Sequence, residues 1–137
     1  RLVGSEMCIR DSPSAVRMAF RLFPGRICLI SDALRCCGMP DGHYTLGRQA
    51  VFLSDGVARL ADGTIAGSTA NLYDCMRNAV AFGIPREQAV LSATAIPARA
   101  IGRQDEIGII ADGLYADFVV CGEDLTRQAV YLGGSLL

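Results

Sequence analysis

The sequence predicts an α/β fold, with helices around one buried strand and a small β region after them. The first observation is the segment 26–32, RICLISD, whose apolar residues fall on both faces of an expected strand. Such strands are typical of parallel sheets covered by helices. The second is a helical pattern on each side of that strand. The third is a change at Ile107, after which short apolar stretches alternate with glycine and aspartate turns. This order indicates the end of an α/β barrel followed by a small sheet.

The first elements are a helix, the buried strand and a hairpin. The helix is expected at 14–22, where Val16, Ala19 and Phe20 share an apolar face and Pro24-Gly25 ends the pattern. The hairpin is expected as an insertion at about 44–65, because Asp-Gly turns at 55–56 and 62–63 separate alternating segments.

Three helices are expected next. The first begins after Ser68 or Thr69 as N-cap. Its inward positions are Leu72, Met76, Ala79 and Val80. The second runs from Pro85 to Ala93, and the third begins at Pro97 and ends at Gly102, since proline favours a first helical turn and glycine a helix end.

The composition argues against several classes of protein. The 137 residues are 51% hydrophobic and 20% charged, which argues against disorder. A formal net charge of −1 provides no basic surface, so we expect no nucleic-acid partner. No uncharged apolar run approaches the roughly 18 residues of a membrane span, so we expect no membrane partner and a soluble chain.

Residues 1–11, RLVGSEMCIRD, match none of the patterns that follow, and we expect them to be a non-native scar of sequence assembly. Without Cys8, five cysteines remain, and no pair has the C-x-x-C spacing of a zinc or redox site. Cys36 and Cys37 could form a vicinal disulfide or bind a metal, but two reduced side chains in a turn is the favoured interpretation. Reduced cysteines favour a cytoplasmic location.

Asp32 is the first candidate for chemistry. It follows directly on the expected buried strand. Side chains at the C-terminal ends of barrel strands point into the active-site mouth, where a carboxylate can act as a general base. The alternative is an aspartate that only stabilises a turn or caps the next segment, and position alone does not decide between the two.

The second candidate is the segment 63–68, GTIAGS. Its two glycines allow a close approach of backbone to a ligand, and we expect no side chain to be tolerated at Gly67. The alternative is a plain hairpin exit that leads into a helix cap. His43 is the chain's only histidine, and we expect it in an exposed turn, because a zinc site needs about three or four ligands.

Four segments together closely resemble the C-terminal third of the N-acetylglucosamine-6-phosphate deacetylase family of metal-dependent amidohydrolases. They are LISDA at 29–33, GTIAGS at 63–68, SATAIPARAIG at 92–102 and GIIADGLYADFVV at 108–120. The resemblance extends from about Pro13 to Leu137. It implies a (β/α)8 barrel whose last strand and closing helices lie in 12–106, and a small β-sandwich whose C-terminal strands lie in 107–137.

The resemblance also implies roles for individual residues. Asp32 matches the family's catalytic aspartate, which takes a proton from water and passes it to the leaving amine of an amino-sugar phosphate. Ile65, Ala66 and Gly67 match a stretch that lines the substrate site through its backbone. The family's divalent metal ion, zinc or iron, is held by ligands that match no residue of this chain, so we expect the ligands upstream and the chain to be a partial, inactive copy. The family also implies a homodimer at full length.

Two alternatives remain open. A different amidohydrolase, such as a deaminase, a cyclic amidase or an aminoacylase, would share Asp32 and the β tail, although GTIAGS favours the sugar-phosphate deacetylase. A non-catalytic α/β binding module would use Asp32 only structurally.

Overall fold

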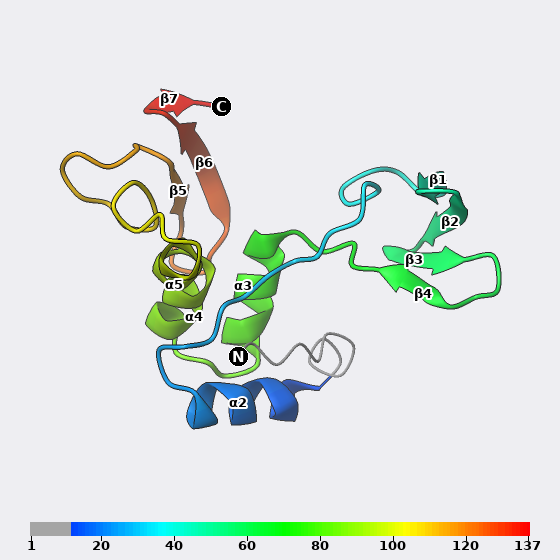
Figure 1. Cartoon of the computed structure of the whole chain (residues 1–137), viewed down its shortest axis with the longest axis horizontal. Helices are drawn as coiled ribbons and strands as arrows, with labels where there is room; N and C mark the ends of the chain where they lie inside the picture. The colour runs from blue at the N-terminus through cyan, green and yellow to red at the C-terminus, as the bar shows by residue number, and fades with distance from the viewer. Residues whose placement is uncertain (1–11) are drawn as a thin grey trace. The chain divides into compact units, whose positions relative to one another are not determined.

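The computed structural model describes residues 12–137 (Figure 1). The described residues divide into two compact units, of which 12–28 with 76–137 form the first and 29–75 the second. The expected non-native segment 1–11 lies outside the described residues.

The second unit contains a four-stranded antiparallel sheet in the order β1-β2-β3-β4. The strands are β1 Gly42–Leu46, β2 Gln49–Ser54, β3 Val57–Leu60 and β4 Ile65–Gly67. Asp55 and Gly56 form the β2–β3 turn with φ of 51° and 71°, and Asp-Gly tolerates these positive values well. The hairpin prediction is therefore confirmed, while β1 extends the sheet by a strand that the sequence did not predict.

One face of this sheet carries the core of the unit. Val51 and Leu53 alternate with exposed neighbours along β2, and their backbone partners across the β2–β3 ladder are Leu60 and Ala58. The buried cluster comprises Cys36, Val51, Leu53 and Ala58, with Leu34, Tyr44, Leu60 and Ala66 packed against it. The segment before β1 thus covers one face of the sheet.

The prediction of a buried strand at 26–32 is wrong. Residues 26–32 belong to neither described sheet, and Ile30 is 63% exposed. The chain instead pairs one position later, where Ala33 and Ser68 form an isolated parallel bridge. A parallel strand requires neighbouring strands to pair with, and the described strands pair with one another in two antiparallel sheets.

The helices lie close to their predicted positions, although α5 begins two residues before the predicted Pro97. They are α2 Pro13–Leu22, α3 Leu72–Ala81, α4 Arg86–Ala93 and α5 Ala95–Ala100. The predicted cap of α3 is wrong, because Asn71, not Ser68 or Thr69, accepts the N–H of Asp74 at 2.9 Å through its Oδ1. The hydroxyl of Ser68 accepts the N–H of Ala70 instead, at 3.2 Å, in a turn that precedes the helix.

The first unit ends in a three-stranded antiparallel sheet of β5 Phe118–Cys121, β6 Arg127–Leu132 and β7 Ser135–Leu136. Phe118 and Tyr131, paired across β5 and β6, stack with ring centroids 4.6 Å apart. The strands expected directly after Ile107 are absent from the described residues, since 107–117 forms turns and bends. The assignment of these elements to a barrel end and a sandwich stays a prediction.

Candidate functional site

Asp32 adopts a backbone conformation that is uncommon for its residue type. Its φ is 46°, in the left-handed region that few residues other than glycine enter. Aspartate and asparagine tolerate this region better than most residues because their short polar side chains can bond locally. Asp32 is exposed to solvent. The exposed carboxylate therefore stands on a residue with left-handed backbone geometry.

A parallel bridge connects the segment after Asp32 to the segment after β4. Ala33 pairs with Ser68, and the N–H of Leu34 donates to the carbonyl oxygen of Ser68 at 2.8 Å. Asp32 precedes Ala33 by one residue, and Gly67 precedes Ser68 by one. The two predicted parts of the site, Asp32 and β4, therefore lie in adjacent stretches of backbone.

The segment GTIAGS is a strand rather than a loop over its central residues. Ile65, Ala66 and Gly67 form β4, where Gly67 pairs with Ala58 and Ile65 with Arg59 of β3. All three β4 residues are half-buried. The segment is therefore the last strand of the hairpin and leads toward α3, and only the helix cap of the alternative interpretation is wrong, because Asn71 caps α3.

Gly67 lies directly beneath the side chain of Leu34. A Cβ atom at Gly67 would come within 2.9 Å of both Cγ and Cδ2 of Leu34, closer than real Cβ contacts allow. The prediction was that glycine allows the approach of a ligand here, whereas the nearest atoms belong to Leu34. Sequence reasoning missed Leu34, because its contact with Gly67 spans 33 positions and no local pattern marks it.

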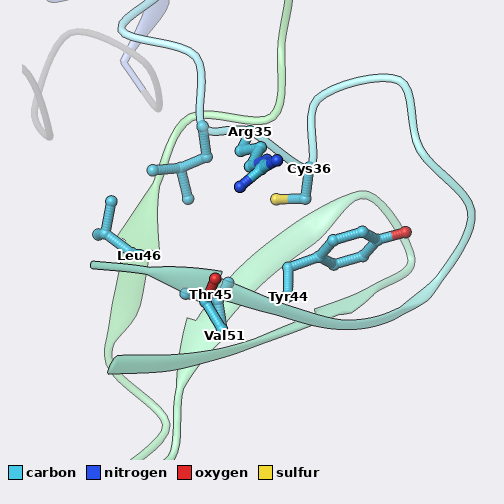
Figure 2. Close-up of a pocket in the computed structure, with 7 residues that line it drawn as sticks. Arg35, Cys36, Tyr44, Thr45, Leu46 and Val51 are labelled. Carbon is cyan, nitrogen blue, oxygen red and sulfur yellow. The ribbon is translucent and has the colours of Figure 1, made fainter. Parts of the chain in front are cut away.

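A small depression lies beside the site on the core side of the sheet. Figure 2 shows Arg35 and Cys36 on the segment that passes over Tyr44, Thr45, Leu46 and Val51. Cys36 is only 1% exposed, and the Tyr44 hydroxyl donates to the carbonyl oxygen of Pro40 at 2.6 Å. Asp32 is not among the lining residues, so this depression is a packing feature of the core.

The cysteines of the described part of the chain form no disulfide bond, as the sequence predicted for Cys36 and Cys37. Burial raises the pKa of the Cys28 and Cys75 thiols above its ordinary value. A raised pKa keeps the thiol protonated, and only the thiolate is a good nucleophile or metal ligand. Cys28 and Cys75 therefore add no reactive thiolate to the site.

His43 is exposed as expected, but it lies on β1 rather than in a turn. Its ring contacts Phe52 of β2 edge to face, with centroids 4.7 Å apart and planes at 74°. Among residues 12–137, no three histidine, cysteine or acidic side chains are grouped so that they could hold a metal ion. The residues present therefore do not fit a metal site by themselves. In the same stretch, no helix has the length and apolar character to cross a membrane.

Comparisons with known proteins identify relatives. Residues 36–137 match the model of the amidohydrolase family, whose members are generally metal-dependent. The chain is 37% identical over 126 residues to the N-acetylglucosamine-6-phosphate deacetylase of Vibrio furnissii, covering 91% of this chain and 32% of that protein. It is 35% identical over 125 residues to a putative N-acetylgalactosamine-6-phosphate deacetylase of Escherichia coli K12, covering 90% of this chain and 75% of that protein.

A solved structure shows the same likeness in three dimensions. It is a mutant N-acetyl-D-glucosamine-6-phosphate deacetylase from Mycobacterium smegmatis, in complex with N-acetyl-D-glucosamine-6-phosphate. Its sequence identity is 40% and its TM-score 0.81, over 91% of this chain and 34% of the other. This chain thus spans about a third of the length of the Vibrio relative and of the Mycobacterium structure.

Proposed function

Because this chain belongs to the amidohydrolase family, we propose that it supplies the catalytic aspartate and part of the sugar site of an N-acetylglucosamine-6-phosphate deacetylase. The observation that carries the proposal is the bridge between Ala33 and Ser68, which brings the backbone at Asp32 beside the end of β4. The names of the Vibrio and Mycobacterium relatives support the substrate class.

In the proposed reaction Asp32 moves one proton twice. Its carboxylate accepts a proton from a water molecule as the water oxygen bonds to the carbonyl carbon of the N-acetyl group. The protonated Asp32 then donates this proton to the amide nitrogen as the carbon–nitrogen bond breaks. The products are acetate and glucosamine 6-phosphate, and the carboxylate is regenerated. An exposed carboxylate suits both steps, because it can hydrogen-bond to water and to a bound amide.

The role proposed for Ile65, Ala66 and Gly67 is to line the sugar site. Their side chains are apolar or absent, so polar recognition along β4 would come from backbone N–H and C=O groups. Because Asp32 and β4 lie immediately before the two residues of the same bridge, a sugar held along β4 would present its acetyl group near the carboxylate.

Further parts of the proposal lie outside this chain's own residues. The divalent ion, zinc or iron, would be held by residues of the full-length protein outside the chain, since the described residues contain no suitable cluster. The full-length protein is proposed to be a cytoplasmic homodimer.

N-acetylgalactosamine 6-phosphate is the second candidate substrate. The observation that favours it is the similarity to the Escherichia coli K12 relative, of which this chain covers 75%. The two sugars differ only in the configuration of one hydroxyl group, and the reaction at the acetyl group would be the same.

The test is an acetate-release assay on the full-length protein that contains this sequence. N-acetylglucosamine 6-phosphate, N-acetylgalactosamine 6-phosphate and unphosphorylated N-acetylglucosamine are compared, with the free amine measured as the second product. We expect the highest kcat/KM for the first sugar. If neither phosphorylated sugar releases acetate, the proposed function is overturned. A higher kcat/KM for N-acetylgalactosamine 6-phosphate would make that sugar the first candidate substrate.

A further inference from the structure

The conformation of Asp32 requires support from its surroundings. A residue other than glycine at a φ of 46° carries a conformational cost, which persists only where neighbouring contacts impose it. The contacts that can do so are those that fix the chain on either side of Asp32. The strongest described ones lie two residues later, at Leu34.

Leu34 is fixed by its backbone and by its side chain. Its N–H donates to the carbonyl oxygen of Ser68 at 2.8 Å, and its own carbonyl oxygen accepts the N–H of Cys37 at 2.9 Å. Its side chain is half-buried against the core cluster defined above. The same side chain covers Gly67, whose lack of a Cβ leaves room for it.

We propose that Leu34 is a positioning residue for Asp32. Its side chain occupies the space that the absence of a Cβ at Gly67 leaves on β4, and we call this space the notch. Only Ala33 separates Leu34 from Asp32, so an anchor at Leu34 fixes the direction in which the chain leaves Asp32. Because the notch is part of β4, the anchor also sets the distance between the carboxylate and the proposed sugar site. The assignment rests on the proposed function, in which Asp32 is the general base.

Two substitutions disturb this anchor in opposite ways. Leu34→Ala removes Cγ and both Cδ atoms and empties the notch, whereas Gly67→Ala fills it with a methyl group and displaces Leu34. In the full-length protein each is expected to lower kcat by about 10–100-fold, the range for a misplaced catalytic group. KM should change less than about threefold, because the backbone groups of β4 remain. Leu34→Met supplies an unbranched apolar side chain of similar volume and should restore most of kcat.

The double variant Leu34→Ala/Gly67→Ala provides a second test, because the effects of the two substitutions on kcat should not add. A methyl group at residue 67 meets mainly Leu34 atoms, and Leu34→Ala removes them. Gly67→Ala should therefore lower kcat by less than about twofold further when it is added to Leu34→Ala. Full additivity of the two effects would contradict the proposed contact.

Leu60→Ala is the matched control. Leu60 is also a half-buried leucine packed against the same cluster, but it lies on β3, away from the bridge. It should lower the melting temperature without lowering kcat. Hydrogen exchange of the peptide 29–37 gives a readout independent of activity, and it should be faster in Leu34→Ala than in Leu60→Ala.

The outcomes separate the two proposals. A lower kcat for Leu34→Ala, recovery in Leu34→Met and an unchanged kcat for Leu60→Ala would support the positioning role. Equal changes in Leu34→Ala and Leu60→Ala, or equal exchange of 29–37 in both, would overturn it. Full activity of Asp32→Asn would overturn the proposed function. It would also overturn the role of Leu34, because Asp32 would then not be a general base that needs positioning. If Leu34→Ala does not fold, the kcat of Gly67→Ala and of Leu34→Met, and their hydrogen exchange at 29–37, are compared with those of Leu60→Ala instead.

Discussion

Ala33 pairs with Ser68 in a parallel β-bridge, and the N–H of the next residue, Leu34, donates to the carbonyl oxygen of Ser68. The bridge closes a span of 35 positions that contains the whole four-stranded sheet. The sheet therefore acts as an insertion whose two ends are brought together. Asp32 lies immediately before one end of the insertion and β4 at the other, which is why the two predicted site elements are neighbours.

The first prediction concerns Asp32→Asn in the full-length protein. An amide cannot accept a proton from water, and loss of a general base costs about 10²–10⁴-fold in rate. We expect kcat to fall by that factor while KM and metal content stay near normal, since asparagine has the same size and tolerates a positive φ. Steady-state kinetics and metal analysis measure both. Asp112→Asn, at an exposed turn in the other unit, is the control and should keep full activity.

Helices and tight turns could be predicted from the sequence because their signals are local. Pro24-Gly25 follows α2, Pro85 precedes α4, and Asp55-Gly56 makes the β2–β3 turn. The prediction of a strand at 26–32 was wrong because its apolar pattern gives no information about a partner strand to pair with. Strand β1 was missed for the same reason, since its pairing with β2 decides that it exists.

The candidate site could be predicted only in part. Asp32 and Gly67 were chosen by residue type and spacing, and the structure brings their segments together. Their roles stay predictions. The contact between Gly67 and Leu34 could not be predicted, because it depends on how the insertion returns to its start. The cap at Asn71 was missed because two other good cap residues, Ser68 and Thr69, stand just before it.

The second prediction concerns Asn71→Ala. Asn71 accepts the N–H of Asp74 at the start of α3, and alanine would remove this side-chain acceptor. We expect the free energy of unfolding to fall by about 1 kcal/mol, measured by urea unfolding. Asn78→Ala, an exposed position inside the same helix, is the matched control. It should be neutral or slightly stabilising, since alanine is the better helix former. An equal loss in both variants would contradict the cap.

The third prediction concerns Gly108, which is needed for two reasons. Its φ is 103°, and a Cβ there would lie 2.6 Å from Cβ of Ala98 on α5. Gly108→Ala should destabilise the protein by roughly 2–3 kcal/mol, because the backbone of α5 limits relaxation. Gly113→Ala measures the cost of the positive φ alone, without a steric clash. Gly113 has a φ of 87°, and nothing lies within 4 Å of its added Cβ. Thermal unfolding should show the smaller loss at Gly113. The reverse order would contradict the contact with α5.

The fourth prediction concerns the titration of Asp124. The Thr126 hydroxyl, and then the Thr126 N–H, donate to this carboxylate and hold its pKa below its ordinary value. A pKa that is lower in the folded state stabilises the fold above the ordinary pKa, and this contribution is lost as the pH falls through the folded value. Thr126→Val removes the hydroxyl and should raise the pKa of Asp124 partway back, measured by carbonyl NMR.

Thr64→Val is the matched comparison for Thr126→Val. Asp62 also has a lowered pKa, but there the backbone N–H of Thr64, at 2.9 Å, contributes more than the hydroxyl. Valine at residue 64 keeps that N–H, so the pKa of Asp62 should rise less than that of Asp124. An equal or larger rise at Asp62 would contradict this ranking.

The fifth prediction concerns residues 12–137 expressed alone. We expect no deacetylase activity, because the described residues offer no group of three metal ligands around Asp32. We also expect poor solubility, since large apolar side chains are open to solvent in both units. Ile30 is 63% exposed and Ile110 85% exposed. Exposed apolar side chains that are not scattered singly promote self-association.

Three measurements on this chain decide the fifth prediction: the soluble fraction, the metal bound per chain, and acetate release from N-acetylglucosamine 6-phosphate. Asp32→Asn in the same chain is the control, because any activity that it retains comes from a contaminant or from a different base. A soluble monomer that binds one equivalent of zinc and loses its acetate release in Asp32→Asn would refute the prediction. It would also show that the ligands lie within these residues, in an arrangement other than the one described. Insoluble or metal-free protein without activity is the expected result, because Asp32 can accept a proton only from a water molecule that other groups have already activated.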